Sequence, residues 1–594
     1  MTHSTTERGV DRSEVTPRQQ VRQWVGSRAV STVVAVVAVM CTTALHVFAA
    51  WGAVGPVWAD DEIGVLANAR VIAGVGPPLE LQHFGYYPGW SVVLAPLWWL
   101  LDDPGQIYRA AVALSALCGV LLIIPLAAIA RRLGVAAPLA VTIAAIVAAA
   151  PARTVMSNYV ITENFLTLMI AFSVVAAIRF SKSRSAGWAA VLGANVAYVF
   201  FTHGRAITLV AVTGVWFLTM VRRRPRAAAA GLISLVVLSC GALAINRTIS
   251  AQLYGAGSDR EGSSLAALLT TTPVSFAQAA LGQAWYLSAA WAGLVILGAG
   301  TLVVWAVREV RTRRIGIASW AIAALAAATA LSAGLASVGI TQGLDRLDVF
   351  IYGRYIDPFV VPVVLLGLVL VVRKLSRRAG LLLVAAAVVI NGLFLTLSVP
   401  NIPRGGWWAP INIPGVLLRL WPTAGDTGPA PWLATGLVAI VFGMCFLALR
   451  RWPVLSVLAV AAYFAIASVA ADVRAVDRFN VSFNVEPELV ATVQQLGSRH
   501  SLSFDSDRAD VVAQNLYQYW FADRRVDVFD SIKEKPATEL VIARTTWEKG
   551  AAEGALRVAS AKRGDALWVM PGALQRHLLD DGRVQLAGQP ALAK

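Results

Sequence analysis

AVSTVVAVVAVMCTTALHVFAA (residues 29–50) and the acidic segment WADDEIG (residues 58–64) that follows it are the stretches that decide the fold of this chain. The apolar run is as long as a transmembrane helix, which needs about 20 such residues. The apolar core of a cleaved signal peptide would be shorter, about 7–15 residues. We therefore expect a retained signal-anchor, preceded by an arginine-rich tail over residues 1–28 that stays in the cytoplasm.

The composition extends this interpretation to most of the chain. Of 594 residues, 57% are hydrophobic and 14% are charged, and the mean hydropathy is +0.65. Soluble proteins average about 45–50% apolar and about 25% charged residues. The sequence therefore predicts an all-α polytopic membrane domain over residues 29–471. The expected spans are residues 29–50, 108–130, 135–150, 160–179, 187–202, 206–221, 228–246, 285–306, 316–340, 355–373, 380–398, 432–450 and 454–471.

The net charge of +16 reflects topology rather than a nucleic-acid partner. Basic residues gather in short loops after every second apolar run, which is the positive-inside pattern. These loops hold residues 131–132, 182–184, 222–226, 308–314, 373–378 and 450–451. With the N-terminal tail inside, the chain crosses the plasma membrane about thirteen times and ends outside. We expect no nucleic-acid binding.

Two segments lie outside this series of spans. Residues 90–101 are apolar but short, and counting them as a span would invert every later loop. We expect them to form an interfacial or re-entrant helix within one external loop, residues 51–107. Residues 472–594 alternate helix-like and strand-like segments, which predicts a small extracytoplasmic α/β domain without a nucleotide-binding Gly-rich loop. Its expected helices are 486–497 and 508–520, and its expected strands are 502–504, 526–529, 540–543 and 566–570.

Three consecutive carboxylates, Asp60, Asp61 and Glu62, follow the first span. Carboxylates at a bilayer surface are costly to keep charged, so a cluster there is a candidate functional site. The alternative is structural, because acidic side chains stabilise a helix N-terminus. That alternative accounts for one or two acids more readily than for three.

The acids are followed by Arg70, Gly74, Tyr-Tyr-Pro-Gly at residues 86–89 and Leu-Ala-Pro-Leu at residues 94–97. This order of motifs resembles the GT-C glycosyltransferases. More narrowly, it is similar to the protein-mannosyltransferase and aminoarabinose-transferase branch and to actinobacterial cell-wall arabinosyltransferases. The similarity covers roughly residues 29–210, while the remainder agrees in topology. Those families have an acidic pair, whereas this chain has three acids.

The resemblance implies a transferase that takes a sugar from a polyprenyl-phosphate donor. Soluble nucleotide sugars are not supplied outside the plasma membrane, so a lipid-linked donor also fits the expected topology. The acceptor would be a cell-wall glycan, a lipid or a protein. Direct displacement needs a carboxylate to take the proton of the acceptor hydroxyl. We expect Asp61 to be this base, with Glu62 and Asp60 as the next candidates.

Other polar residues are candidates for binding the substrates. In the resembled families an acidic residue in this loop faces the first acid, so Glu163 is expected to hold the acceptor or a divalent ion. The alternative is structural, with an N-cap at which Thr162 opens the next helix. His203 and Arg205 interrupt two apolar runs, where an anion such as the donor phosphate would offset their cost. Snorkelling of Arg205 to lipid headgroups is the alternative.

A later segment, Tyr352-Gly353-Arg354-Tyr355, resembles the Arg-Tyr that opens a late helix in GT-C enzymes. We expect Arg354 to be the main phosphate ligand, ahead of Arg205, and Tyr355 to flank it. The alternative is an interfacial aromatic anchor.

Four aromatic and histidine positions complete the candidates. Tyr87 belongs to the Tyr-Tyr-Pro-Gly motif and is expected near the substrate. His83 would bind a metal only together with Asp61, and two scattered ligands are weak evidence for a metal site. A divalent cation is left open, and no other cofactor is expected. Trp407 and Trp408 would stack on a sugar, but a membrane-interface belt is favoured.

Other functions remain as alternatives. A transporter or flippase of a lipid-linked saccharide would need charged residues at mid-span and paired broken helices in two related halves. A scaffold protein would show no activity that depends on Asp61. A GT-C-related ligase or polymerase would place catalytic Arg and His residues in a large late loop, for example at Arg404.

Overall fold

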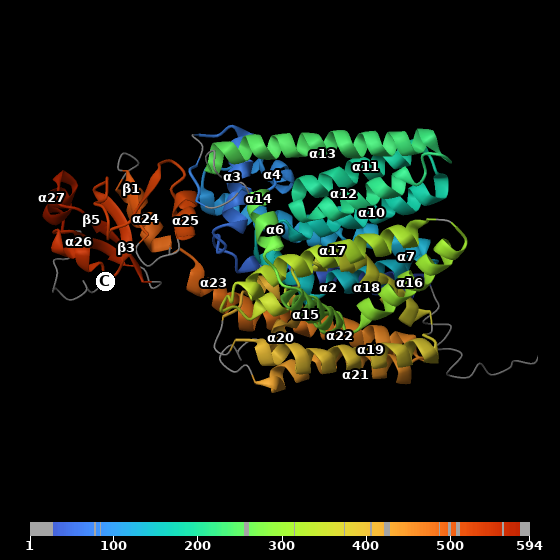
Figure 1. The fold of residues 1–594 in the computed structure, drawn as a ribbon. Coiled ribbons are helices and arrows are strands. Elements are labelled where there is room, and N and C mark those ends of the chain that lie inside the picture. Colours follow the sequence, from blue (N-terminus) through green and yellow to red (C-terminus); the bar gives the residue numbers. More distant parts are fainter. Residues whose placement is uncertain are drawn as a thin grey trace, which may run out of the picture.

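The computed structural model describes most of the chain, which forms a helical bundle with a small sheet at one end (Figure 1). The described residues are 28–76, 79–82, 85–254, 260–313, 315–373, 375–403, 407–420, 428–485, 487–496, 501–506, 511–560 and 564–582.

Eight helices of the described residues are long and apolar enough to cross a membrane, and two bent helix pairs raise the number to ten. The chain is therefore a multi-pass membrane protein with an all-α bundle, as predicted. The eight are built on α2 (Arg28–Trp51), α6 (Pro104–Leu121) with α7 (Ile123–Arg132), α10 (Glu163–Ser183), α13 (Pro225–Tyr254), α17 (Ile317–Thr341), α19 (Arg377–Leu393), α21 (Pro429–Ala448) and α22 (Pro453–Ala471). The bent pairs are α8 (Ala137–Ala148) with α9 (Pro151–Thr154) and η1 (Val155–Asn158), and α14 (Arg260–Leu269) with α15 (Pro273–Ala290).

About thirteen spans were predicted, and eight to ten meet this length test among the described residues. Every predicted span coincides with a helix, but three of these helices are short: α11 (Ala186–Thr202), α12 (Ile207–Leu218) and α18 (Asp357–Val372). The span predicted at 285–306 is broken. Ala292 and Gly293 both adopt positive φ angles, 51° and 74°, and separate α15 from α16 (Leu294–Arg311).

The apolar stretch 90–101 forms two short helices, α4 (Gly89–Leu94) and α5 (Leu97–Leu100), rather than a span. Helix α4 packs against α3 (Asp61–Ala73) and α11. Gly89 permits this close approach, because a Cβ there would lie 2.6 Å from the backbone nitrogen of Thr202. The start of α3 is thereby fixed against the bundle.

The bundle and the sheet are joined by a continuous helical segment. Helix α22 continues through a π-helical turn, η8 (Asp472–Val476), into α23 (Asp477–Phe483). Helical hydrogen bonding therefore continues past residue 472, the position at which the change of composition predicts the start of the soluble domain.

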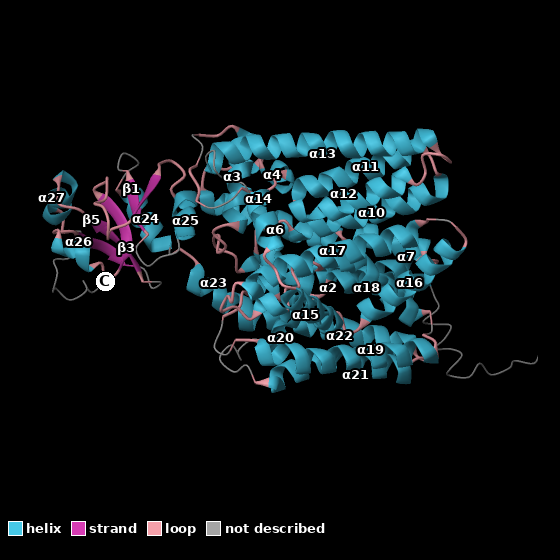
Figure 2. Ribbon diagram, in the orientation of Figure 1, coloured by secondary structure: helices cyan, strands magenta, loops and turns pink. Residues whose placement is uncertain are grey.

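The sheet has five strands in the order β2-β1-β3-β5-β4 (Figure 2). Strand β1 pairs parallel to both β2 and β3, and β5 pairs antiparallel to β3 and β4. The strands are β1 (Leu502–Asp505), β2 (Val526–Phe529), β3 (Leu540–Arg544), β4 (Leu556–Ser560) and β5 (Asp565–Val569). The helices are α24 (Pro487–Gln495), α25 (Gln514–Trp520), α26 (Glu548–Ala552) and α27 (Ala573–Asp580). The four predicted strands are present, while β4, α26 and α27 were not predicted.

Helix α25 attaches this unit to the loop that follows α3. The amide side chain of Asn515 accepts a hydrogen bond from the backbone N–H of Gln82 (2.9 Å). It also donates a hydrogen bond to the backbone carbonyl oxygen of Gln82 (3.1 Å). The hydroxyl of Tyr519 donates to the carbonyl oxygen of Pro104, at the start of α6 (2.7 Å). Figure 1 shows α25 between the sheet and α3.

Candidate active site

A cavity of about 1210 Å³ lies at the end of the bundle that carries α3. Three kinds of side chain line it. The polar wall contains Asp60, Asp61, Thr162, His203, Arg205, Arg346, Tyr352, Arg354 and Tyr355. The aliphatic wall contains Leu243, Leu265, Leu268, Leu331 and Leu335, from α13, α14 and α17. The third wall contains Trp58, Phe479, Phe483, Val512, Ala513 and Leu516, from the entry to α3, from α23 and from the segment around α25.

Two carboxylates and two arginines form a chain of ion pairs in the polar wall. Nη1 of Arg354 lies 2.6 Å from Oδ2 of Asp61, and its Nε lies 2.5 Å from Oε1 of Glu163. The same Glu163 oxygen lies 3.3 Å from Nη2 of Arg205. Arg354 and Glu163 are buried, whereas the Asp61 side chain is 24% exposed. Asp61 is therefore the member of this chain that is open to the cavity.

Burial acts to lower the pKa of Arg354, but the charges of Asp61 and Glu163 outweigh it and hold that pKa well above its ordinary value. The guanidinium is fixed as a permanent cation between two acids. A cation at this distance favours the charged form of a carboxylate. The backbone N–H of Arg354 also donates to the carbonyl oxygen of Asn412 (3.0 Å), which anchors the segment before α18.

Arg205 has spare hydrogen-bonding capacity beside the cavity. Its guanidinium lies over the ring of Tyr355, 4.1 Å from the centroid, and its Nη2 lies 2.8 Å from Nε2 of His203. Its Nη1 is buried without a hydrogen-bond partner among the described residues. A buried guanidinium donor that lacks a partner is costly, so this one suits an anionic ligand.

Glu62 occupies a different environment from Asp61. Its side chain is fully buried and its two oxygens accept four hydrogen bonds: from the backbone of Val57 (2.8 Å), Trp58 (3.0 Å) and Val160 (2.9 Å), and from the hydroxyl of Tyr108 (2.7 Å). Burial raises the pKa of Glu62 above its ordinary value, while these hydrogen bonds act against the rise. This geometry supports a structural role, because Glu62 is not among the residues that line the cavity.

Glu163 lies at a helix start and also takes part in the ion-pair network. Helix α10 begins at Glu163 and Thr162 is its N-cap residue, but the Thr162 side chain does not cap the helix. The fully buried Glu163 carboxylate instead serves as the shared counter-ion of Arg205 and Arg354. The two arginines thereby satisfy the charge that a divalent ion would otherwise balance.

The remaining predicted residues lie as follows. Tyr87 lines the cavity and packs on Phe200, with ring centroids 5.3 Å apart. A Cβ at Gly204 would lie 2.8 Å from the Tyr87 ring, so Tyr87 and the loop at 203–205 fit closely together. His83 lies outside the described residues. Within the described part of the chain, no group of three or more His, Cys, Asp or Glu side chains is placed to hold a metal ion.

Sequence reasoning missed a second ion pair in the polar wall. Arg346 binds Asp348 through two hydrogen bonds, 2.6 and 3.1 Å long, and its guanidinium lies 4.9 Å from the ring centroid of Trp407. Asp348 also accepts a hydrogen bond from Asn412. Trp407, for which a membrane belt was favoured, lines the cavity. The Asp-Arg-Leu-Asp pattern at residues 345–348 was the available signal.

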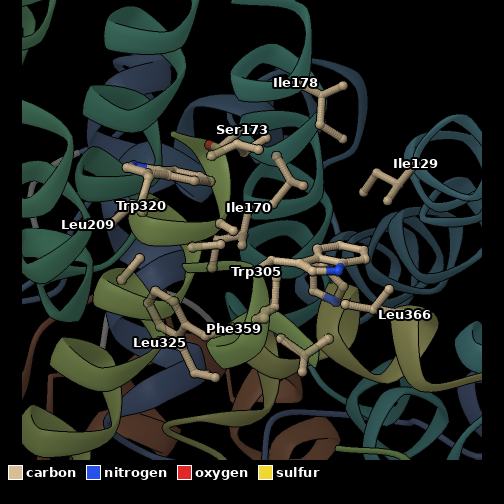
Figure 3. Close-up of a pocket in the computed structure, with 18 of the residues that line it drawn as sticks. Ile129, Ile170, Ser173, Ile178, Leu209, Trp305, Trp320, Leu325, Phe359 and Leu366 are labelled. Carbon is tan, nitrogen blue, oxygen red and sulfur yellow. The ribbon is translucent and has the colours of Figure 1, made fainter. Parts of the chain in front are cut away.

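A second cavity, of about 160 Å³, lies among α7, α10, α16, α17 and α18 (Figure 3). Trp305, Trp320 and Phe359 surround it together with aliphatic side chains, and Ser173 is the hydroxyl-bearing residue. None of the described residues that line it is ionisable. This cavity offers no group for acid–base chemistry, whereas the first cavity is lined by carboxylates and arginines and is the candidate active site.

The fold is shared with solved structures. No protein-family model matches the chain, and no curated protein matches its sequence. ArnT from Cupriavidus metallidurans bound to undecaprenyl phosphate has a TM-score of 0.53 and 16% identity, over 91% of this chain and 98% of that one. ArnT from the same organism in the apo state has a TM-score of 0.52 and 15% identity, over 93% of this chain and 99% of that one. Arabinosyltransferase EmbB from Mycobacterium smegmatis has a TM-score of 0.42 and 15% identity, over 76% of this chain and 42% of that one. The match to ArnT confirms the predicted GT-C fold.

Proposed function

We propose that this protein is a membrane glycosyltransferase that moves a sugar from a polyprenyl-phosphate donor to an extracytoplasmic acceptor. The observation that carries the proposal is the chain of ion pairs Asp61–Arg354–Glu163–Arg205 on the wall of a large cavity. It puts a partly exposed carboxylate and cationic hydrogen-bond donors on one surface. Sugar transfer from a phosphate needs both, a base for the acceptor and cations for the leaving group.

We assign the donor to two walls of the cavity. Its phosphate binds at Arg205 and His203, where the buried Nη1 of Arg205 has no hydrogen-bond partner among the residues that the structure describes. Its prenyl chain leaves along the aliphatic wall toward the bilayer. The large exposed fraction of Leu265 in that wall, 60%, supports an opening on the lipid side. The ArnT structure with undecaprenyl phosphate makes this lipid class a reasonable donor carrier.

We assign the two arginines in the reverse of the order expected from the sequence. Arg354 already has carboxylates at its Nε and Nη1, so we assign it to holding Asp61 in place. Arg205 shares one carboxylate oxygen at the longer distance of 3.3 Å and keeps an unused donor. The phosphate therefore gains more from Arg205.

In the reaction the acceptor hydroxyl attacks the anomeric carbon. A glycosidic bond forms as the bond between that carbon and the phosphate oxygen breaks, and its electron pair leaves with the polyprenyl phosphate. The Asp61 carboxylate takes the hydroxyl proton. A single displacement of this kind inverts the anomeric configuration. Arg205 and His203 stabilise the negative charge that develops on the phosphate.

The test is the binding of undecaprenyl phosphate to purified protein in lipid nanodiscs. Arg205→Ala should weaken binding roughly 10- to 100-fold, because a hydrogen bond to a charged group contributes about 1.5–3 kcal/mol. Arg205→Lys should recover part of the loss, since it keeps the charge but not the planar fork. Arg354→Ala should lower the transfer rate more than it lowers this affinity.

Arg109→Ala is the matched control. Arg109 is an exposed arginine on α6, at the same end of the bundle, and it does not line the cavity. If Arg205→Ala binds undecaprenyl phosphate with wild-type affinity and Arg354→Ala binds it weakly, Arg354 is the phosphate ligand instead. Equal affinity in both variants and the control would refute this donor site.

A further inference from the structure

We propose that the end of the bundle opposite the candidate active site binds an anionic phospholipid, in a cleft lined by Arg377, Arg450 and Arg451. The ligand class is a glycerophospholipid whose headgroup carries a net negative charge. The inference goes beyond the proposed function and does not depend on it, because none of these arginines lines the cavity that contains Asp61.

The cleft lies where α19 meets the turn between α21 and α22. It has a volume of about 360 Å³ and is lined by Arg377, Leu447, Ala448, Arg450 and Arg451. Helix α19 begins at Arg377, and α21 ends at Ala448, just before the other two arginines. Figure 1 shows α19 and α21 side by side. Pockets for small ligands have volumes from about 300 Å³ upward, so the cleft has room for a small polar group.

Two glycine contacts show that α19 and α21 pack as an antiparallel pair. A Cβ at Gly380, near the start of α19, would lie 2.9 Å from Cδ1 of Leu447, near the end of α21. Toward the other ends of the two helices, a Cβ at Gly436 would meet the side chain of Asn391. The start of α19 therefore lies beside the end of α21, which brings the arginines of the two segments together.

The cleft is far from the candidate active site along α18. Arg354 lines the active-site cavity just before α18 begins at Asp357, and α18 ends at Val372, five residues before Arg377. Helix α18 has 16 residues, and a helix of that size is roughly 24 Å long. The two sites therefore lie at opposite ends of the bundle. The arginines of the cleft belong to loops that the charge pattern predicts to be cytoplasmic.

The positive charge of the cleft is not balanced by acidic residues of the helices that form it. No Asp or Glu occurs in residues 358–425 or 427–471, which include α19, α21 and α22. Among the residues that the structure describes, none of the three arginines forms an ion pair. The N-terminus of α19, at Arg377, adds a partial positive charge. Guanidinium groups donate to phosphate in a planar, bidentate geometry, so the cleft suits a phosphate group.

The surroundings of the cleft favour a lipid over a soluble anion. The helices that meet there carry largely exposed apolar side chains, and Leu382 of α19 and Trp452 before α22 are 70% and 66% exposed. Met444 of α21 and Val454 of α22 are also exposed. In a multi-pass membrane protein such a surface faces lipid, and Trp is typical of the headgroup level. A phospholipid would therefore place its phosphate on the arginines and its acyl chains on this apolar surface.

The experiment is native mass spectrometry of the full-length protein in detergent, titrated with phosphatidylglycerol and with zwitterionic phosphatidylcholine. We expect one phosphatidylglycerol to bind more tightly than phosphatidylcholine, with an affinity that falls as the salt concentration rises. A variant with Arg377→Gln, Arg450→Gln and Arg451→Gln should lose roughly 100-fold in affinity, because each basic residue at such a site contributes roughly fivefold. Lysine at the same three positions should retain part of the affinity, since it keeps the charge but loses the planar fork.

The matched control removes the same number of charges from another loop. It carries Arg222→Gln, Arg223→Gln and Arg224→Gln, at three exposed arginines between α12 and α13 that do not line the cleft. Its affinity for phosphatidylglycerol should be close to that of wild type. Phosphatidylglycerol should also raise the thermal midpoint of wild type and control, because a ligand that binds the folded state stabilises it, and it should not raise that of the first variant.

Equal losses of affinity in the two triple variants would overturn the proposal, because they would show a general attraction between basic loops and anionic lipid. Wild-type protein that binds phosphatidylcholine as tightly as phosphatidylglycerol would overturn it as well. Inorganic phosphate at constant ionic strength distinguishes the sources of the anion: if phosphate alone raises the thermal midpoint and blocks the lipid, the cleft is a site for free phosphate. If the first triple variant does not fold, Arg450→Gln decides, with an expected loss of roughly fivefold.

Discussion

Asp61 and Glu62 are adjacent in sequence, yet the two faces of α3 that carry them differ in every physical respect. The Asp61 face borders the cavity, and its carboxylate is 24% exposed and paired with Arg354. The Glu62 face is fully buried, and its carboxylate is saturated by backbone N–H groups and by Tyr108. Consecutive residues on an α-helix point about 100° apart, because a turn has 3.6 residues. A shift of one position along the helix therefore separates Asp61, which borders the cavity, from Glu62, which is held in the buried interior.

The comparison has a practical consequence for interpreting variants. Replacing either acid should reduce the activity of a membrane preparation, but for different reasons. Asp61 should affect the rate per folded molecule, and Glu62 the amount of folded protein. Measurements that do not separate these two quantities would make the two acids look alike.

Asp61→Asn is expected to have the largest effect. Loss of a general base typically lowers the rate by about 10²–10⁴-fold. The amount of folded protein in the membrane should stay near normal, since the isosteric amide fits the same space. Transfer of a lipid-linked sugar by purified protein measures the rate, with exposed Asp102→Asn in the same loop as the control. A near-normal rate in Asp61→Asn, together with a loss of rate in Asp60→Asn, would identify Asp60 as the base.

Glu163→Gln should disturb both folding and activity. The buried carboxylate balances Arg205 and Arg354, and removing one partner of a buried ion pair costs about 3–5 kcal/mol. The thermal midpoint should fall, and the folded fraction should bind undecaprenyl phosphate poorly because Arg205 loses its anchor. A variant with wild-type stability would show that solvent, rather than Glu163, balances the two arginines.

Glu62→Gln should mainly lower stability. The amide NH₂ would face donors that now bind the carboxylate, and each buried donor left unsatisfied costs about 1–3 kcal/mol. The yield of folded protein and its thermal midpoint measure this loss. The rate per folded molecule should change far less than in Asp61→Asn. Equal rate losses in the two variants, at normal yield, would place Glu62 in the chemistry and remove the contrast between the two faces.

Asn515→Ala should have the smallest effect. It removes two hydrogen bonds to the backbone of Gln82, each with a net contribution of about 0.5–1.5 kcal/mol. Faster hydrogen exchange at residues 79–82, without global unfolding, is the expected result. Gln495→Ala, in the same unit but outside this contact, is the control. Unchanged exchange would mean that the hydrogen bond from Tyr519 to Pro104 suffices to dock the unit against the bundle.

Much of the fold could be predicted because hydropathy is a local property of sequence. Each predicted span coincides with a helix, and the four predicted strands lie where alternation placed them. The errors occurred where local signals are weak. The break at Ala292 and Gly293 lies inside an unbroken apolar run, and β4 (Leu556–Ser560) pairs irregularly with β5 through a register shift between Arg557 and Ala559.

The site was predicted in part. Asp61, Glu163, Arg205 and Arg354 were all singled out, and they lie in one network. Their partnerships were not foreseen: Arg354 was expected to meet a phosphate, whereas in the structure it joins two acids. Arg346 and Asp348 were missed although they lie two residues apart, because their other neighbours in space, Trp407 and Asn412, are far away in sequence.

The sequence by itself determined that this is a multi-pass helical protein with an acidic cluster after its first span and basic residues before a late helix. These conclusions depend on length, apolarity and charge, which each segment carries alone. Only the tertiary structure decided which acid faces the cavity and what it meets there. Asp61 and Arg354 are 293 positions apart, and Arg354 and Glu163 are 191 apart. Their contacts exist because the packing of α3, α10 and α18 brings three helix ends together, and no local pattern in the chain encodes that meeting.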